Sequence, residues 1–254
     1  RARRLTCSRM TDLWYEDSGS GQPALLLHEG VVDSRIWNPF LPYVEGRLRT
    51  IRYDQRGYGR SPMWTGPYSA VDDLVSVLDA VGVEEAALVG TSRGGRIAIQ
   101  TALERPDRVS ALVLVASGLA GRPLDIDVTP EQEARWDAAE AAGDLAELAA
   151  IDVEIWAPMG VDDELRAMFV ENVEASNAED PDRDLPSAGR LGEIGVPTLV
   201  VTGGRDVPEI NELGELLAQE IPGARSAVIE EADHMVQWRA PEELAQLVLD
   251  FLAE

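Results

Sequence analysis

The sequence predicts an α/β fold whose sheet is mostly parallel and doubly wound, with a helical cap inserted into it. Short runs that are apolar throughout, typical of strands buried on both faces, alternate with amphipathic helical segments. The chain has 254 residues, of which 45% are hydrophobic, and this suffices for one large domain with a sizeable core. The alternation stops between Gly118 and Ile194. We therefore expect residues 1–118 and 195–254 to form the core and residues 119–194 to form the cap.

The expected strands are short and apolar, and they cover residues 23–28, 48–53, 86–89, 109–116, 196–202 and 225–229. The expected helices carry apolar residues on one face, and Ser69 is the expected N-cap of one of them. They cover residues 34–44, 69–80, 96–103, 130–142, 144–156, 161–177, 209–220 and 241–252. The basic residues 1–9 are either an edge strand that pairs with residues 13–16 or a disordered leader.

The composition excludes several classes of function. A formal net charge of −24 argues against nucleic acid or an anionic membrane as a partner, and it favours small-molecule substrates that are neutral or cationic. The chain has no lysine, which rules out Schiff-base catalysis and a P-loop, and no Cys/His cluster that could hold zinc. The single Cys7 cannot form an internal disulfide and fits a cytoplasmic protein, and no apolar run is long enough for a membrane helix.

The segment Gly90-Thr91-Ser92-Arg93-Gly94 lies where an expected strand turns into an expected helix. A serine at such a turn needs small neighbours two positions away, and its hydroxyl then projects at the top of the sheet. The Arg93 amide would point to the place where an oxyanion forms, and the helix directs the positive end of its dipole there. Alone, this pattern is also typical of a flexible loop. Between a strand and a helix it indicates a nucleophilic serine.

Several motifs resemble those of the α/β-hydrolase family, and the resemblance covers nearly the whole chain. These motifs are His28-Glu29-Gly30, residues 54–61, residues 90–94, Gly203-Gly204-Arg205-Asp206 and Asp233-His234. Family members carry a catalytic triad in the order serine, acid, histidine. The resemblance implies a sheet of the α/β-hydrolase type with Ser92 as nucleophile, His234 as base and Asp206 as the acid that orients the base.

Two of these assignments have alternatives. His234 could be a surface histidine beside acidic residues, and Asp206 could be a solvated loop carboxylate. Asp125 and Asp127 are reserve candidates for the acid of the triad. The chemistry of such a triad requires no metal and no organic cofactor.

The family's oxyanion hole needs two amide donors, which the resemblance assigns to Arg93 and Gly30. The sequence departs from the family pattern at Glu29, which stands where glycine is usual. A carboxylate so close to an oxyanion would be repulsive unless it points away, so this residue puts the geometry of the Gly30 donor in question. We expect His28 to be a structural residue that holds this loop.

Two further segments have structural or electrostatic interpretations. Residues 54–61 are expected to form a structural turn, in which glycines adopt positive φ and Arg56 binds carbonyl groups. Asp233 and the pair Glu230-Glu231 adjoin His234, and we expect their negative charge to raise the pKa of its imidazole.

Aromatic residues and methionines are expected either to pack as ordinary core or to line an apolar substrate pocket under the cap. The candidates for this pocket are Trp37, which follows the oxyanion loop, and Trp136, Trp156, Met159 and Met168 in the cap.

These residues and the resemblance predict a serine hydrolase that cleaves small or medium carboxylic esters or lactones through an acyl-enzyme on Ser92. Residues 52–62 and 66–69 are similar to those of 3-oxoadipate enol-lactonases, which favours lactones or enol esters. The same triad supports C–C bond or thioester hydrolysis, perhydrolysis and lyase chemistry. A non-catalytic ligand-binding protein could also keep the fold.

Overall fold

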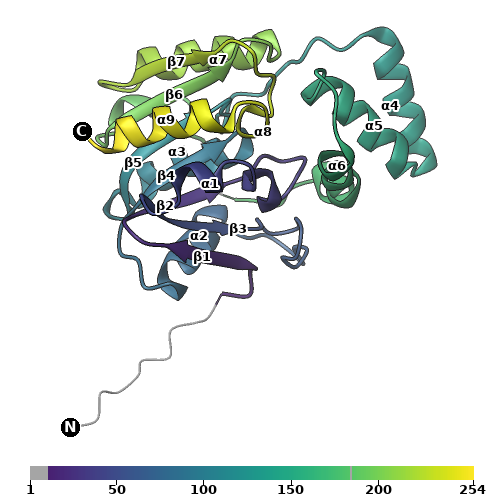
Figure 1. Cartoon of the computed structure of the whole chain (residues 1–254). Helices are drawn as coiled ribbons and strands as arrows, with labels where there is room; N and C mark the ends of the chain where they lie inside the picture. Colours follow the sequence, from purple (N-terminus) through teal and green to yellow (C-terminus); the bar gives the residue numbers. More distant parts are fainter. Residues whose placement is uncertain (1–10, 184) are drawn as a thin grey trace.

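The computed structural model of the protein describes residues 11–183 and 185–254, and a seven-stranded sheet forms its centre (Figure 1). The strand order is β1-β3-β2-β4-β5-β6-β7, in which β1 is antiparallel to β3 and every other neighbouring pair is parallel. The expectation of a mostly parallel sheet is confirmed. The strands are Tyr15–Gly19 (β1), Gln22–Leu27 (β2), Leu48–Tyr53 (β3), Ala86–Thr91 (β4), Val109–Val115 (β5), Thr198–Gly203 (β6) and Arg225–Ile229 (β7).

The edge strand β1 pairs with β3, where Tyr15 and Glu16 lie opposite Tyr53 and Arg52. The two alternatives for residues 1–9, an edge strand paired with residues 13–16 or a disordered leader, both stay predictions. All of β1 is exposed, so its sequence shows none of the apolar character that identifies the central strands. Residues 1–9, together with Cys7, lie outside the described part of the chain.

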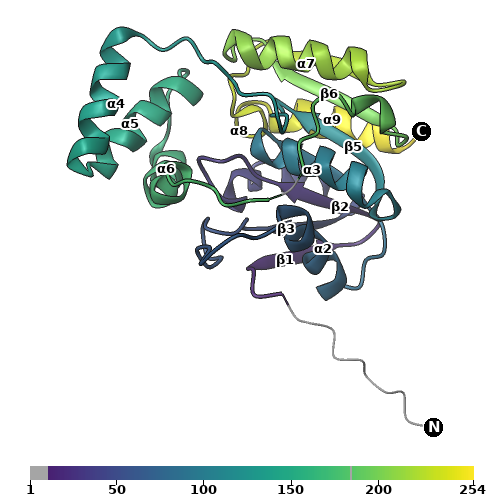
Figure 2. The same cartoon turned by 180° about the vertical axis from the view of Figure 1, so that it is seen from behind.

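Helices cover both faces of the sheet, which confirms the doubly wound fold (Figure 1 and Figure 2). Consecutive strand residues supply the two cores, because side chains alternate across a strand. The core helices are Leu41–Val44 (α1), Ala70–Ala80 (α2), Arg93–Glu104 (α3), Pro208–Glu220 (α7), Val236–Arg239 (α8) and Pro241–Leu252 (α9), with 3-10 helices at Ser34–Trp37 (η1), Pro106–Arg108 (η2) and Leu191–Glu193 (η3). Leu26 and Val89 belong to the core beneath α1 and α9, whereas Leu25 and Leu88 belong to the core beneath α2, α3 and α7.

The single helix expected over residues 34–44 is wrong, because the structure has η1 and α1 there instead. Two prolines explain the break. Pro39 and Pro42 lack the amide proton that a continuous helix would use, and the proline ring clashes with the preceding turn. In contrast, the expected N-cap at Ser69 is present, since its hydroxyl accepts a hydrogen bond of 3.0 Å from the Asp72 amide.

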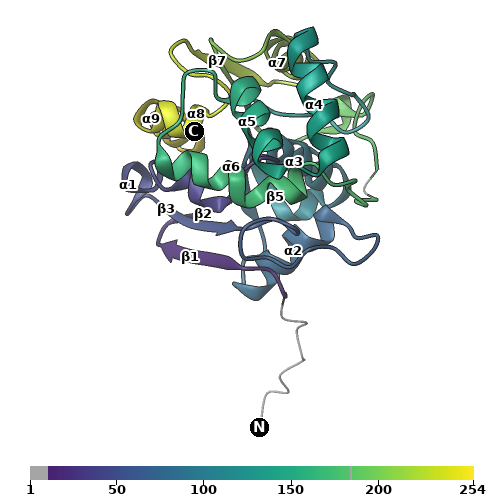
Figure 3. The same ribbon diagram turned by 90° about the vertical axis from the view of Figure 1, so that its right-hand side faces the viewer.

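Three further helices, which we call the cap helices, lie beyond the carboxyl ends of the central strands. They are Pro130–Ala142 (α4), Leu145–Trp156 (α5) and Asp163–Ser176 (α6), and they face the viewer in Figure 3. Asn172 fastens α6 to the core: its Oδ1 accepts a hydrogen bond of 2.8 Å from the Gly59 amide, and its Nδ2 donates one of 3.1 Å to Asp33. The division at residues 119 and 194 stays a prediction.

Among the helices that the structure describes, none is both long enough and apolar enough to cross a membrane.

Candidate active site

Ser92 lies in a strained turn between β4 and α3. Its backbone has φ 51° and ψ −114°, a combination that residues with a side chain rarely adopt. The neighbouring glycines allow this turn: a Cβ at Gly90 would lie 2.4 Å from the carbonyl oxygen of Gly94, and a Cβ at Gly94 would lie 2.5 Å from that of Leu27. The Ser92 amide donates to the Val115 carbonyl at 3.0 Å, which holds the turn against β5. The fold therefore stores strain to place Ser92 at the end of β4.

Asp206 and His234 are joined by a buried hydrogen bond. The Nδ1 of His234 lies 2.9 Å from Oδ2 of Asp206, and the two side chains are 2% and 1% exposed. The other oxygen of Asp206 accepts the Val207 amide at 2.8 Å, which fixes the carboxylate. An ionised carboxylate can only accept a hydrogen bond, so Nδ1 of His234 must carry the proton that it donates to Asp206. In the neutral imidazole, Nε2 then has a free lone pair.

Two neighbouring loops bring these side chains together. Asp206 follows β6 and His234 follows β7, and the Arg205 amide donates to the Ala232 carbonyl at 2.9 Å, which ties the loops to each other. Ser92 follows β4, which is parallel to both strands in the same sheet. The three residues predicted for a triad thus lie at the same edge of the sheet, where the carboxyl ends of these strands meet.

The reserve acids lie elsewhere. Among the described residues, Asp206 is the carboxylate that hydrogen-bonds His234. Asp125 lines a cavity beside the cap helices, and the amide of Asp127 donates to Glu209 at 3.1 Å.

The pKa of His234 is raised above its ordinary value. Burial acts to lower this pKa, but the charge and hydrogen bond of Asp206, followed by the charges of Glu29 and Asp233, outweigh the effect of burial. Asp233 is the last of these contributors, and Arg239 pairs with its carboxylate at 2.8 Å. Glu231 is turned to the surface, where it pairs with Arg205. The direction expected from the sequence is therefore present, although Asp206 and Glu29 are the main negative charges.

The two residues expected to donate to an oxyanion are neighbours. A Cβ at Gly30 would lie 3.4 Å from Cδ and 3.6 Å from Cβ of Arg93. Arg93 is the first residue of α3, so its amide has no carbonyl acceptor within the helix. The amide is thus available to a ligand, at the positive end of the helix dipole.

Glu29 is fully buried, and its carboxyl group is held by Gln237 of α8. The side-chain amide of Gln237 lies 2.9 and 3.0 Å from the two carboxyl oxygens of Glu29. Burial raises the pKa of Glu29 to about 7, against the opposing effects of its own backbone amide, His234 and Gln237. No local pattern indicates this contact, because the partners are 208 positions apart and α8 is absent from the expected helices.

His28 holds the loop that follows β2, as expected for a structural residue. The Gln55 amide donates to Nε2 of His28 at 2.9 Å, so the proton lies on Nδ1, which donates to the Glu29 carbonyl at 2.7 Å. Burial lowers the pKa of His28, and the ring stays neutral.

The turn at residues 54–61 is structural, and Gly57 and Gly59 adopt φ values of 89° and 53° there. The expectation that Arg56 binds carbonyl groups is wrong. Its guanidinium pairs with Asp73 at 2.8 Å and with Asp12 at 3.0 Å, because it extends past the turn to carboxylates on α2 and before β1.

The side chain of Arg93 connects the site to the segment that follows the cap helices. It donates to Gln55 at 2.8 Å and to the Tyr68 hydroxyl at 2.7 Å, and it forms an ion pair with Asp180. Asp180 is absent from the residues predicted for the site, since a single acid among 46 acidic residues has no distinctive local pattern.

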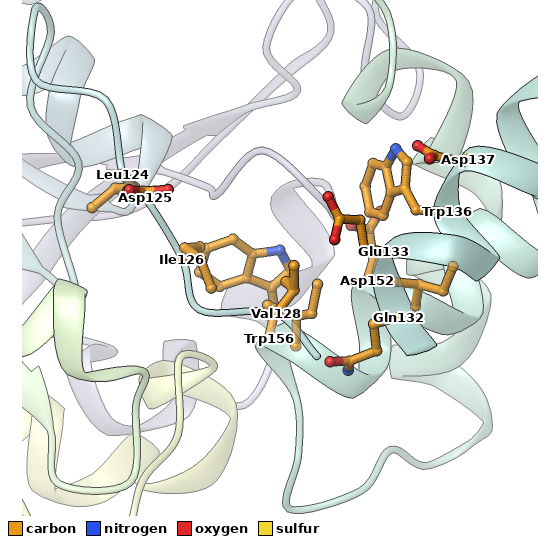
Figure 4. Close-up of a pocket in the computed structure, with 12 residues that line it drawn as sticks. Leu124, Asp125, Ile126, Val128, Gln132, Glu133, Trp136, Asp137, Asp152 and Trp156 are labelled. Carbon is orange, nitrogen blue, oxygen red and sulfur yellow. The ribbon is translucent and has the colours of Figure 1, made fainter. Parts of the chain in front are cut away.

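The residues expected to line a pocket separate into two groups. Trp136 and Trp156 line a cavity of about 350 Å³ (Figure 4). The ring of Trp156 also packs against His234, with ring centroids 4.5 Å apart. Trp37 and Met168 are fully buried in the apolar core and do not line this cavity, whereas Met159 is exposed and its amide donates to Asp233.

Within residues 11–183 and 185–254, no group of three His, Cys, Asp or Glu side chains is placed to hold a metal ion.

Comparison with known proteins places these features in a family. The profile of the alpha/beta hydrolase family matches residues 24–247. A 2-hydroxy-6-oxononadienedioate/2-hydroxy-6-oxononatrienedioate hydrolase of Paraburkholderia phymatum is 31% identical over 94% of this chain and 90% of its own. The structure of Est816, an N-acyl homoserine lactone degrading enzyme, is similar with a TM-score of 0.73 and 32% identity, over 94% of this chain and 96% of its own. The enol-lactonase from Burkholderia xenovorans has a TM-score of 0.77 and 27% identity, over 95% of this chain and 96% of its own.

Proposed function

Because the chain belongs to the alpha/beta hydrolase family, we propose that it is a serine hydrolase that cleaves small or medium carboxylic esters or lactones. Ser92 is the nucleophile, His234 the general base and Asp206 the acid that orients and stabilises the imidazolium. The observation that carries the proposal is the buried hydrogen bond of 2.9 Å between Asp206 and His234, at the sheet edge where Ser92 occupies a strained turn.

The first half of the reaction acylates the serine. His234 Nε2 takes the proton of the Ser92 hydroxyl while Oγ forms a bond to the carbonyl carbon, and the π electrons of the carbonyl move to its oxygen. The amides of Arg93 and Gly30 stabilise that oxyanion. When the intermediate collapses, the C–O bond to the alcohol breaks and His234 protonates the leaving oxygen. In a lactone, this step opens the ring.

The second half releases the acid. His234 takes a proton from water as the water oxygen attacks the acyl carbon, and the same two amides hold the new oxyanion. Collapse breaks the bond to Ser92 Oγ, which regains its proton from His234. Asp206 stays ionised throughout and stabilises the imidazolium that each step forms.

Glu29 is compatible with this chemistry. Gln237 holds its carboxyl group, and a pKa of about 7 keeps the group largely neutral in the lower part of the physiological pH range. A neutral carboxyl group does not repel the oxyanion as a carboxylate would.

Support for lactones as substrates comes from the two structural relatives, one named an N-acyl homoserine lactone degrading enzyme and the other an enol-lactonase. A second candidate is C–C bond hydrolysis of an oxo-dienedioate, which the name of the Paraburkholderia relative suggests. The same triad would serve that reaction, so substrate profiling has to separate the two.

A fluorophosphonate probe and a substrate panel test the proposal together. We expect one probe adduct on the intact protein, located at Ser92, and hydrolysis of p-nitrophenyl esters or lactones by the wild type. Ser92→Ala should lose both, and Asp206→Asn should reduce kcat by roughly 10³–10⁴-fold with the fold intact. Thr91→Ser, which alters the motif without touching the nucleophile, is the matched control and should keep the adduct.

Two results would contradict the proposal. The absence of any adduct on the wild-type protein would favour a ligand-binding protein. Cleavage of oxo-dienedioates with no activity on esters or lactones would favour C–C bond hydrolysis.

A further inference from the structure

A cavity of about 350 Å³ lies between the segment that leads from β5 to the cap and the helices α4 and α5. Figure 4 shows Leu124 and Asp125 on the connecting segment, with Trp136 and Asp137 across the cavity on α4. Its volume falls within the range of small-molecule sites, which is about 300–1,000 Å³. The cavity can therefore take a substrate arm of moderate size.

The walls of the cavity are mainly apolar and aromatic. Trp136 and Trp156 contribute their rings, and Ile126, Val128 and Ile155 contribute aliphatic surface. An apolar arm placed here would lose its contact with water and gain contact with two rings, which is favourable in free energy.

Every charged side chain that lines the cavity is acidic. These side chains are Asp125, Glu133, Asp137 and Asp152, and neither Arg nor His is among the lining residues described. The arginine of α4, Arg135, pairs with Glu147 at 2.6 Å and with Glu154 at 3.0 Å, so it is not free to neutralise them.

Asp152 is the buried member of these four acidic residues, and it places a carboxyl group inside the cap. It is 4% exposed and accepts a hydrogen bond of 3.3 Å from the Ser176 hydroxyl. Its pKa is raised to about 6 by burial, so the group still carries negative charge at pH 8.

Trp156 links the cavity to the candidate active site. The same indole ring that lines the cavity lies 4.5 Å, centroid to centroid, from the imidazole of His234. A substrate whose carbonyl carbon is beside Ser92 can therefore place its distal arm along Trp156 and into the cavity.

We propose that this cavity binds the distal arm of the substrate and selects for an apolar arm without negative charge, so that carboxylate-bearing substrates are rejected. The inference rests on the proposed hydrolase function and names its substrate class. An anionic arm would meet four carboxylates without a compensating cation. Asp125, Glu133 and Asp137 are exposed, so their repulsion is moderate and is weakened by salt, whereas Asp152 is buried and its charge is screened least. Dicarboxylate substrates, such as the one in the name of the Paraburkholderia relative, would be excluded.

Matched pairs of esters test the selection kinetically. One pair is p-nitrophenyl hexanoate and mono-p-nitrophenyl adipate, which differ in a terminal carboxylate on the acyl arm. The other is methyl 4-acetoxybenzoate and 4-acetoxybenzoate, which differ on the leaving group. At pH 8 and low salt we expect kcat/KM for the anionic member to be at least about 10-fold lower in one pair or both. This gap should narrow when 0.5 M NaCl is added.

Charge-neutralising variants identify the residues responsible. The double variant Glu133→Gln/Asp137→Asn should raise kcat/KM for the anionic ester about three- to ten-fold and change the neutral ester less than two-fold. The control Glu140→Gln/Glu174→Gln removes the same total charge from exposed positions of α4 and α6 outside the cavity, and it should change neither ester. Equal kcat/KM for the neutral and anionic members of both pairs in the wild type would overturn the inference.

A binding measurement separates this inference from the proposed function. Calorimetric titration of Ser92→Ala with methyl 7-oxooctanoate and with 7-oxooctanoate should show at least about 10-fold tighter binding of the neutral ketone. If the wild type cleaves no ester but this preference holds, the proposed chemistry fails and the cavity inference stands. If esters are cleaved but both ketones bind equally, the cavity inference fails and the proposed chemistry stands.

Discussion

Gln237 donates its side-chain amide to both carboxyl oxygens of Glu29, at 2.9 and 3.0 Å, in a region from which water is excluded. The Oε1 atom of Gln237 is buried and has no hydrogen-bond partner among the described residues. A protonated Glu29 would resolve this, because rotation of the amide would let Oε1 accept the carboxyl proton. Both observations agree with the pKa of about 7 that burial imposes on Glu29.

The first prediction concerns stability and pH. Folded Glu29 holds its proton to about pH 7, whereas the unfolded chain releases it near pH 4.5. Between these values the unfolded state binds fewer protons, so this residue's contribution to the free energy of unfolding falls as pH rises, by about 3 kcal/mol in all. Glu29→Gln removes this titration. We therefore expect the variant to gain stability over the wild type between pH 5 and pH 8, as urea unfolding would measure.

The difference between the two proteins mainly reports Glu29, because Asp152 and His234 titrate in both. His234 interacts with Glu29, so the pH dependence of the difference contains the ionisation of Glu29 together with the smaller change that the variant causes in the pKa of His234. A stability difference that does not vary between pH 5 and pH 8 would show that Glu29 ionises normally in the folded protein.

The second prediction concerns the pH dependence of activity. His234 must be neutral to accept the serine proton, so the acidic limb of kcat/KM follows its pKa. The ionised form of Glu29 is one of the charges that raise this pKa, after Asp206, and because its own pKa is about 7 it acts in the upper part of the acidic limb. Glu29→Gln should lower the pKa of His234 and move the acidic limb to lower pH. Asp233→Asn should move it less, because Arg239 already compensates the charge of Asp233.

The measurement is kcat/KM for a neutral ester from pH 5 to pH 9 in the wild type and both variants. Because Glu29 and His234 interact, the wild-type limb reports a pair of coupled groups, and the Glu29→Gln limb should approach a single titration. Equal midpoints in all three proteins would mean that neither carboxylate acts on the imidazole.

The sequence predicted those features that depend on local pattern. Apolar runs located every central strand within about two residues, and the sequence from Pro130 to Gly143 located α4, because proline favours the first turn and Gly143 ends the helix with φ 65°. Pairing Asp206 with His234 needed the family's chain order, since neither residue has a distinctive local pattern. The resulting prediction agrees with the hydrogen bond.

Features that depend on tertiary contacts could not be predicted. The direction of the Glu29 side chain is decided by Gln237, which is brought close only after β7 and α8 have packed onto the core. The pocket shows the same limit: Trp37 and Trp156 have the same side chain, but one fills the core beneath α1 and the other lines the cap cavity. The amino-acid composition cannot distinguish a buried core position from a cavity wall, because the packing of the surrounding helices determines which of the two a tryptophan occupies.

The third prediction concerns the strain at Ser92. Its φ of 51° and ψ of −114° are unfavourable for any residue with a Cβ, but glycine adopts them without a steric penalty. Ser92→Gly should therefore be more stable than Ser92→Ala by about 1 kcal/mol, despite the greater entropy of glycine in the unfolded chain. Both variants lack the hydroxyl, so urea unfolding of the two compares the backbone strain at residue 92 with the extra unfolded-state entropy of glycine. A Ser92→Gly variant that is less stable than Ser92→Ala by about 0.4–1 kcal/mol, the cost of that entropy alone, would indicate that the turn is not strained in solution.

The last prediction concerns Gly203, at the end of β6. A Cβ at this position would lie 2.5 Å from the carbonyl oxygen of Ala232 and 2.7 Å from that of Asp233, just before His234. Gly203→Ala should push the loop that carries His234 away from the loop that carries Asp206. We expect kcat/KM to fall at least about 100-fold, while the free energy of unfolding falls by only about 1–3 kcal/mol.

The matched control is Gly195→Ala, at an exposed position where a Cβ would meet no atom within 4 Å. That variant should keep the wild-type kcat/KM. Proton NMR should also show that Gly203→Ala loses the downfield resonance of the His234 Nδ1 proton hydrogen-bonded to Asp206, which the control retains. If Gly203→Ala keeps both the resonance and the activity, the separation of the two loops does not depend on this glycine, and the pairing of Asp206 with His234 must be held by other contacts.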